Sequence, residues 1–457
     1  MEKARHILKG LTAVLMVTVL LACMVPTAFA GFEDEIFESG GYLYSLNADK
    51  TVMIHAYSGK SKNITIPSKL DGKKVTALGE SIGYLNVETI KIPAGITLIE
   101  GGAFTGAPKL KSFTVDKANK KFTAVNGILY SKDKKELVQY PFGKEGTSFT
   151  VPTGTEIIGA VAFYGCYNLG KIALPDSVRV IGASAFAGTG ISTFAIPDGV
   201  KEIGFNAFSM CDALTEITIP GTVSVINMFA FDNCTSLKKI NFLGSEAQWK
   251  KVRIDSYNSG LEAAEVSFVE YKGAVKTVKA SAIKDTSIKF SWSKVSDASG
   301  YKVELYKGKK LEKTVYTTKT AYTFKSLKKG TSYKVNVTAY KNVNGGKAYG
   351  TGKTVSATTK VAKVTLSSVK STKAKQIDVA WKTVSGANGY KVTYSTSKKF
   401  TKKTTKTVTV KKQKTKKTSI KKLKKGKTYY VKVAAYKTVS GKAVLGAYSA
   451  VKTVKVK

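Results

Sequence analysis

The stretch that decides the fold is IPDGVKEIGFNAFSMCDAL, residues 196–214. In this stretch Ile203 follows Pro197 by six residues. The pair Ala207-Phe208 comes next, with Phe208 eleven residues after the proline. The same spacing occurs five times, at Pro93/Phe104, Pro152/Phe163, Pro175/Phe186, Pro197/Phe208 and Pro220/Phe231. Where copies adjoin, the period is 22 or 23 residues. Such a period indicates a stacked repeat in which one coil cannot fold without its neighbours.

Each copy is predicted to form one short strand and a compact return segment. The apolar residues before Pro220 fall on one face of a strand, which we expect to end at the proline because proline has no N–H to donate. Ile226 and Phe231 then fill the interior of the return segment, and the small Ala230 leaves room for the ring. The next coil covers whatever remains open, so stability is a sum of contacts between neighbours.

This pattern resembles the BspA-like class of bacterial leucine-rich repeats, through the motif IPx5IGx2AFx2Cx2L that starts at Ile196. The resemblance covers residues 64–243 and implies a solenoid in which residues 113–151 form a longer variant coil. We expect residues 31–63 to be an N-terminal β-rich cap. Residues 244–272 should form a C-terminal cap and linker.

The C-terminal part of the chain is a duplication. A tryptophan, a Gly-Tyr-Lys-Val stretch and a Leu-x2-Gly-x2-Tyr turn occur in that order twice, with Trp292 and Tyr333 in the first copy and Trp381 and Tyr429 in the second. Alternating strands around one buried tryptophan are typical of a two-sheet sandwich. The copies, residues 273–360 and 361–457, resemble fibronectin type III domains, which implies that the two tyrosines form backbone-bonded corners. The expected fold is mainly β, a leucine-rich repeat solenoid followed by two immunoglobulin-like (fibronectin type III) sandwiches.

The first 30 residues carry the features of a secretory signal peptide. Basic residues precede an apolar run at 11–25, and the stretch AFA ends at Ala30. The run is too short for a comfortable membrane span. We therefore predict cleavage after Ala30, a secreted or cell-surface location, and no transmembrane helix in the mature chain. A second interpretation stays open, because the stretch LLAC resembles a lipoprotein cleavage box that would leave Cys23 lipidated.

Charge divides the chain near residue 273. Basic and acidic residues number 25 each over residues 31–272, whereas 46 lysines accompany five acidic residues over residues 273–457. These lysines can keep solvent-facing strands polar and deter edge aggregation. They can also contact an anionic envelope polymer or glycan through salt-sensitive attraction. Arginine, whose planar fork suits phosphate, is absent from this part. Because arginine is absent from this part and the chain is predicted to be exported, we expect no nucleic-acid partner.

No set of residues indicates catalysis, a metal or a cofactor. His55 is the one histidine left after signal removal, and the acidic residues of the repeats fall at turns and outward positions, so we predict no enzyme and no catalytic residues. Cys166, Cys211 and Cys234 each follow a repeat proline by fourteen residues, in a slot that Thr189 and Ala107 also occupy. This favours small buried thiols over a disulfide. Without further histidines or a CxxC pair, no metal or cofactor is expected.

The strand ladder is the expected binding surface, because each coil presents outward residues at one-strand intervals. These candidate ligand-face residues are Lys91, Thr150, Lys171, Ala173, Thr193, Ala195, Glu216, Thr218, Lys239 and Asn241. The set is small and polar, without an aromatic stripe to stack on sugars, which favours an extracellular or host protein as ligand. The predicted function is non-catalytic adhesion, with the sandwiches as spacer or envelope contact. The alternative is an accessory glycan- or polymer-binding protein that serves separate extracellular enzymes.

Overall fold

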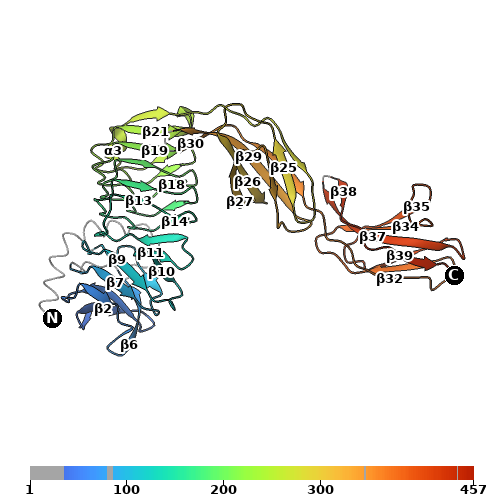
Figure 1. The fold of residues 1–457 in the computed structure, drawn as a ribbon, viewed down its shortest axis with the longest axis horizontal. Coiled ribbons are helices and arrows are strands. Elements are labelled where there is room, and N and C mark those ends of the chain that lie inside the picture. The colour runs from blue at the N-terminus through green and yellow to red at the C-terminus, as the bar shows by residue number, and fades with distance from the viewer. Residues whose placement is uncertain (1–34, 80–85, 106, 344–345, 440) are drawn as a thin grey trace. The chain divides into compact units, whose positions relative to one another are not determined.

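The computed structural model describes residues 35–79, 86–105, 107–343, 346–439 and 441–457. The predicted cleavage site after Ala30 and the alternative lipidation site at Cys23 lie outside them. The described chain is almost entirely β-strand (Figure 1), as predicted. It forms two compact units, one that reaches to Glu270 and includes Asn342–Ala348, and one of Tyr271–Lys341 with Tyr349–Lys457.

Strand pairing at the start of the first unit changes from antiparallel to parallel. β1, β2 and β3 pair antiparallel, β3 then pairs parallel with β6, and β6 pairs parallel with β8 and antiparallel with β5. Their bounds are β1 (Phe37–Ser39), β2 (Tyr42–Leu46), β3 (Val52–Tyr57), β5 (Lys69–Leu70), β6 (Lys73–Leu78) and β8 (Leu98–Ile99). The hairpins thus give the parallel coils a first surface on which to stack.

Two series of strands run along the repeats. The first, here called the proline ladder, contains the strands that precede the repeat prolines: β4 (Asn63–Thr65), β7 (Thr89–Ile92), β9 (Ser112–Val115), β13 (Ser148–Thr150), β15 (Lys171–Ala173), β17 (Thr193–Ala195), β19 (Glu216–Pro220), β21 (Lys239–Leu243) and β23 (Glu265–Phe268). Pairing within it is parallel and forms three sheets, β4-β7-β9, β13-β15 and β17-β19-β21-β23.

The second series, the isoleucine ladder, was not predicted. It is one sheet of β10 (Phe122–Val125), β11 (Ile128–Ser131), β12 (Glu136–Gln139), β14 (Ile157–Ile158), β16 (Val180–Ile181), β18 (Glu202–Ile203), β20 (Val225–Ile226) and β22 (Arg253–Ile254). β10, β11 and β12 pair antiparallel within the longer coil, and the later strands pair parallel. The isoleucine that recurs six residues after each repeat proline therefore lies in a second short strand, where the sequence indicated only a return segment.

The repeat prolines begin turns between the two ladders. Val200 N–H donates to the Pro197 carbonyl at 3.0 Å, and Val223 N–H donates to the Pro220 carbonyl at 3.0 Å. In β19 the ladder continues through Pro220, one residue further than predicted, because the fixed φ of proline is compatible with an extended backbone. Neighbouring coils also approach closely at Gly182. A Cβ there would lie 2.5 Å from the backbone nitrogen of Ala160 in the preceding coil, so only glycine allows this approach.

The core of the repeats is a stack of phenylalanine rings. Successive pairs of Phe163, Phe186, Phe208 and Phe231 have centroids 5.2–5.3 Å apart and planes within 11° of parallel. All four side chains are fully buried, as are the alanines that precede them. Burying one such ring contributes roughly 1.5–3 kcal/mol. The alanine and phenylalanine spacing in the sequence therefore records one continuous column of packing.

Two single-turn helices lie between the last strands of the two ladders, α2 (Glu246–Trp249) between β21 and β22 and α3 (Ser259–Glu262) between β22 and β23. α2 starts at a capping box in which Ser245 and Gln248 satisfy each other's backbone N–H groups. Trp249 packs edge-on against Phe242 at 5.0 Å. Phe242 is fully buried and also lies edge-on to Phe268 at 6.4 Å, so the tryptophan extends the aromatic packing of the last coils.

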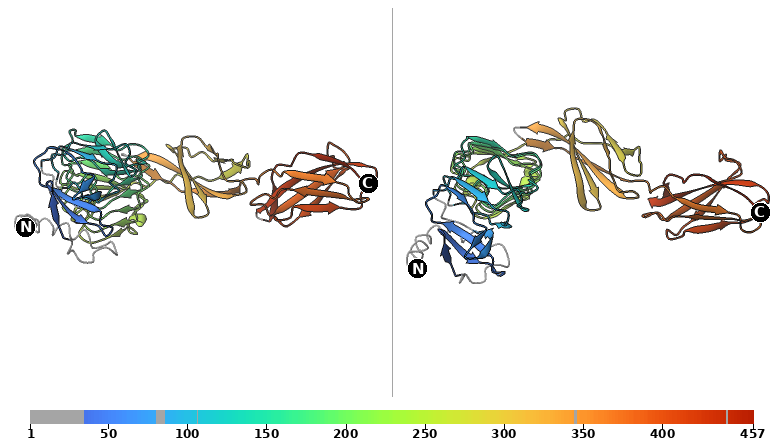
Figure 2. Two further views of the ribbon diagram at one scale, coloured as in Figure 1. Left: turned by 90° about the horizontal axis from the view of Figure 1, so that it is seen from below. Right: turned by 60° about the horizontal axis from the view of Figure 1, so that its bottom comes forward.

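Two sandwiches with the same strand order follow the repeats in the chain. In the first, β24 (Val278–Ser281), β25 (Ile288–Trp292) and β28 (Ala321–Phe324) face β26 (Gly300–Lys307), β27 (Lys310–Thr317), β29 (Ser332–Val343), β30 (Gly346–Tyr349) and β31 (Lys353–Thr358). In the second, β32 (Leu366–Lys370), β33 (Ile377–Trp381) and β36 (Lys417–Ile420) face β34 (Gly389–Ser395), β35 (Thr405–Val410), β37 (Thr428–Val439), β38 (Lys442–Leu445) and β39 (Lys452–Lys455). Figure 2 shows the two layers of each sandwich.

The predicted landmarks of both sandwiches are present. Trp292 and Trp381 are buried. The hydroxyl of Tyr333 accepts from the Lys328 N–H at 3.0 Å, and that of Tyr429 accepts from the Lys424 N–H at 3.4 Å, which forms the expected corners. Sequence reasoning missed that the tyrosines of the Gly-Tyr-Lys-Val stretches also accept backbone N–H bonds, at 2.8 and 2.9 Å.

Candidate functional site

The candidate ligand face lies on the proline ladder. Its members are on β7, β13, β15, β17, β19 and β21, and parallel pairing aligns them in columns, for example Thr193 with Glu216 and Lys239. Adjacent strands place such side chains about 4.8 Å apart. Lys91 belongs to the separate β4-β7-β9 sheet. Thr150, Lys171 and Ala173 lie in the β13-β15 sheet, and the remaining candidates lie in the β17-β19-β21-β23 sheet.

Exposure divides the candidates into three groups. Lys91, Thr150, Lys171 and Thr193 are exposed, whereas Ala173, Ala195, Glu216 and Lys239 are half-buried. Thr218 and Asn241 are 4% and 3% exposed, although the sequence pattern predicted outward positions for both. Their backbones are in register on the ladder, but their side chains offer almost no surface to a ligand.

Polar contacts link the side chains at the later end of this face. The Asn241 amide donates to the Glu216 carboxylate, and the Lys239 ammonium lies 3.9 Å from the same carboxylate. Both contacts are to the same Oε1 atom of Glu216, so its neighbours partly occupy this carboxylate. The accessible part of the face is therefore centred on Thr150, Lys171 and Thr193.

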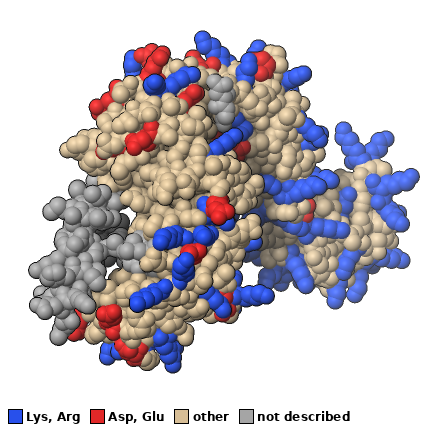
Figure 3. All heavy atoms as spheres, turned by 60° about the vertical axis from the view of Figure 1, so that its left-hand side comes forward, with Lys and Arg blue, Asp and Glu red and all other residues tan. Residues whose placement is uncertain are grey.

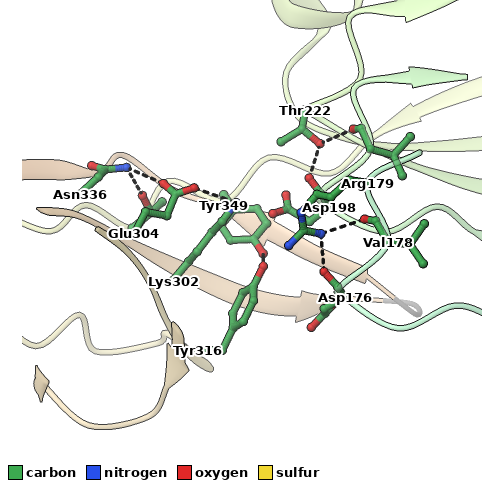
Figure 4. A network of polar contacts seen from close by, with 12 residues as sticks. Asp176, Val178, Arg179, Asp198, Thr222, Lys302, Glu304, Tyr316, Asn336 and Tyr349 are labelled. Atoms are coloured by element: carbon green, nitrogen blue, oxygen red, sulfur yellow. Dashed lines mark hydrogen bonds and ion pairs between the residues drawn. The ribbon is translucent and has the colours of Figure 1, made fainter. Parts of the chain in front are cut away.

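The turns that follow the prolines are held by bonds to their backbone (Figure 4). The Arg179 guanidinium donates to the carbonyls of Asp176 and Val178. The Thr222 hydroxyl lies 2.7 Å from the Asp198 carbonyl, which belongs to the preceding coil. These turns are thus rigid, which fixes where each strand of the proline ladder ends.

The cysteine slot has a structural role that sequence reasoning missed. The Cys211 thiol donates to the Phe186 carbonyl at 3.1 Å, and the Cys234 thiol donates to the Phe208 carbonyl at 3.0 Å. Thr189 likewise donates to the Phe186 carbonyl at 2.8 Å. The slot therefore holds a small buried side chain, and three of its occupants also donate to a buried carbonyl, whereas Ala107 in the same slot of an earlier coil has no donor. The three described cysteines are free and buried.

Burial also suppresses thiol reactivity. It raises the pKa of the Cys166 thiol to about 12, and a hydrogen bond with Cys211 together with burial raises the pKa of Cys234 well above its ordinary value. Both groups stay protonated at neutral pH, whereas nucleophilic chemistry and metal binding require the thiolate. Among the described residues no group of three or more histidine, cysteine or acidic side chains could hold a metal.

His55 lies in β3, and its Nε2 atom is 2.9 Å from the Ser45 hydroxyl. A half-buried histidine bonded to a neighbouring strand agrees with a structural role in this sheet. No helix within the described ranges is long and apolar enough to cross a membrane.

Lysines dominate the surface of the sandwiches. Blue side chains crowd that part of the chain in Figure 3, while both signs alternate over the repeats. In the second copy 27 lysines accompany one acidic residue, Asp378. The Asp378 carboxylate accepts bonds from Ser419 and Gln376 at 2.6 and 2.8 Å, and these polar bonds, with that of Ser419 largest, lower its pKa. The positive charge of this sandwich is therefore almost uncompensated.

Comparisons with known proteins agree with this architecture. The sequence model of the BspA type leucine rich repeat region matches residues 48–126 and 139–253 in six copies, and that of the fibronectin type III domain matches residues 273–351. No curated protein matches the chain.

Several solved structures are similar in fold. A leucine rich cell surface protein of Faecalibacterium prausnitzii is 19% identical over 49% of this chain and 99% of its own, with a TM-score of 0.30. A leucine-rich repeat protein of Eubacterium ventriosum is 18% identical over 50% and 94%, with a TM-score of 0.33. A two-domain fibronectin type III segment of chicken tenascin is 18% identical over 39% and 96%, with a TM-score of 0.25.

The family matches confirm the predicted resemblance and the predicted fold class. Leucine-rich repeats and fibronectin type III domains are typically non-catalytic binding domains, and they suggest a surface or extracellular protein-binding role. The second sandwich repeats the strand order and the tyrosine corner of the first. The chain therefore contains BspA-type leucine-rich repeats and a fibronectin type III domain, followed by a second sandwich with the same strand order.

Proposed function

We propose that this protein is an exported, non-catalytic adhesion protein whose proline ladder binds an extracellular protein. The observation that carries the proposal is the exposed row of Lys171 and Thr193, each four residues before its repeat proline, with Thr150 also exposed on the paired strand β13. The repeats hold these side chains on short strands anchored to a fully packed core. A rigid surface loses little conformational entropy when a partner binds. Export through the segment that ends at Ala30 would deliver this surface to extracellular ligands.

A protein ligand suits this face better than a sugar does. Its accessible members are threonine, lysine and alanine, and none of the ten candidates is aromatic. Sugars usually need an aromatic ring on which to stack, whereas a protein can match a flat polar surface over many small contacts. The ladder extends over several coils, which offers the length that a protein interface of about 800 Å² per partner requires.

The lysine-rich sandwiches are proposed to hold or space the protein at an anionic envelope. With 27 lysines and one acidic residue, the second copy would attract a polyanion chiefly through counterion release. Lysine presents a point charge and not a planar fork, so the contact would be diffuse and not selective for one phosphate geometry. Retention on an anionic polymer should therefore fall steeply as salt rises.

A pair of charge-changing variants tests the ladder. The double variant Lys171→Glu with Thr193→Glu alters the exposed row, and Lys201→Glu with Ser224→Glu makes a matched change at exposed positions outside the proline ladder. On an array of extracellular proteins we expect the first variant to lose the wild-type partner and the second to retain it. Equal binding by both variants, or equal loss, would show that this face is not the binder.

The alternative function, an accessory glycan- or polymer-binding protein, is distinguished by the same array printed with glycans. It would be supported if the wild-type chain bound glycans through Lys171 and Thr193 and bound no protein. Mass measurement of the mature N-terminus separates cleavage after Ala30 from a lipidated Cys23.

A further inference from the structure

Three aromatic side chains from successive coils contact one another outside the core. Phe205 packs edge-on against Phe229 with centroids 5.6 Å apart, and Phe229 stacks on Tyr257 at 4.7 Å with planes 8° apart. Phe205 and Phe229 are half-buried, whereas Tyr257 is 60% exposed. This outer stack is separate from the buried column of repeat phenylalanines and from the proline ladder.

The backbone at the outer stack adopts a conformation that large side chains rarely accept. Phe229 and Tyr257 have φ values of 59° and 63°. Three earlier coils place Val161, Ser184 and Asn206 at the slot of Phe229, with φ values of 62°, 52° and 58°. Small polar residues tolerate the left-handed region, whereas a bulky ring there is strained. The later coils thus carry aromatic rings at positions where a smaller residue would fit the backbone better.

The Tyr257 ring is held rigidly. Asn258, which is 1% exposed, donates to the carbonyls of Asp255 and Asn227 at 2.8 and 3.1 Å and accepts from the Phe231 N–H at 2.9 Å. Because these bonds fix the residue next to Tyr257, the ring loses little freedom when a ligand covers it. Phe229 covers one face of the ring, so the exposed fraction belongs to the other face and the edge.

Polar residues flank Tyr257 in the sequence. Two residues before it, Asp255 pairs with Arg253 at 3.1 Å. Two residues after it, the Ser259 hydroxyl donates to the Asp232 carboxylate at 2.9 Å. An exposed flat ring matches the apolar C–H face of a sugar, and polar side chains of the same segment could bond to the hydroxyl groups at the rim of the sugar.

We propose that the outer face of Tyr257 is a carbohydrate-binding subsite that stacks on a pyranose ring. A single ring backed by one phenylalanine is too small for a protein interface, which usually covers about 800 Å² per partner, but it matches the area of one sugar. The subsite is independent of the proline ladder, so it adds a glycan contact to the proposed protein contact.

The test uses the full mature chain on an array of neutral and acidic oligosaccharides. The variant Tyr257→Asn removes the ring and keeps a residue that the left-handed backbone accepts, as Asn206 shows. Tyr257→Phe keeps the ring. The matched control is Tyr167→Ala, because Tyr167 is 70% exposed.

We expect wild type, Tyr257→Phe and the Tyr167 control to bind the same oligosaccharide, and Tyr257→Asn to bind about tenfold more weakly. The proposal is overturned if no oligosaccharide binds the wild-type chain, if Tyr257→Asn binds as wild type does, or if Tyr257 is required for a protein ligand instead. The Lys171→Glu, Thr193→Glu variant should keep full glycan binding, so failure of the proposed ladder function stays distinguishable.

Discussion

Replacing Phe208 with alanine should uncouple the repeats at their centre. Its side chain is fully buried, with Phe186 and Phe231 stacked on its two faces at 5.2 Å and Phe194 edge-on at 5.0 Å. Loss of a buried phenylalanine costs about 3–5 kcal/mol, because both transfer energy and a cavity contribute. Since three ring contacts are lost together, we expect the upper half of that range, about 4–5 kcal/mol.

Hydrogen exchange measured by mass spectrometry along a urea series is the appropriate assay, because it reports local opening in a chain that does not unfold as one unit. Peptides from the coils on both sides of Phe208 should open more easily in Phe208→Ala, while peptides from the sandwiches stay unchanged. Phe205→Ala, a half-buried ring outside the core, serves as control and should lower the opening free energy by less than about 2 kcal/mol. Equal effects of the two variants, or a change of under about 1 kcal/mol for Phe208→Ala, would refute the continuous column of packing.

Three further outcomes follow from individual contacts. Burial raises the pKa of the Cys166 thiol to about 12, so this thiol should resist alkylation at pH 8 until urea unfolds the repeats. Alkylation of Cys166 in the native chain, detected by mass spectrometry, would contradict this. Tyr333→Phe and Tyr429→Phe should each lower the stability of their own sandwich by about 1–2 kcal/mol, because each leaves a backbone N–H without its acceptor. If calorimetry shows both melting transitions unchanged, the tyrosine corners do not stabilise the sandwiches. Hydrogen bonds from Tyr44 and then Ser39 lower the pKa of Asp71, so its contribution is present above the unfolded pKa of about 3.9 and is lost as pH falls through the lower folded value. Asp71→Asn should therefore flatten the acid side of the stability profile of the first sheet, and an unchanged profile would exclude this contribution.

The core of the repeats could be read from the sequence because every coil repeats the same local requirement. Phe186, Phe208 and Phe231 recur at a fixed distance from a proline, and each meets the same neighbours. The tryptophans and corner tyrosines of the sandwiches were also predicted, because duplication exposes them. The isoleucine ladder was missed, since two-residue strands leave no alternating pattern to detect.

The candidate ligand face was predicted only in outline. Alternation within a strand correctly placed its members in columns, but Thr218 and Asn241 are buried and Glu216 is bonded to two neighbouring side chains. Burial depends on what covers a residue from elsewhere in the chain, and a strand pattern contains no information on that.

By itself, the sequence determined the period, the residues that face inward, the second architecture and the concentration of lysine, because each of these is set by local spacing or composition. Only the tertiary structure decided which outward residues are accessible, that the cysteine slot donates to a carbonyl of the preceding coil, and that Phe205, Phe229 and Tyr257 meet. The reason is physical: these contacts join residues more than twenty positions apart in different coils, and they form only once the coils have stacked.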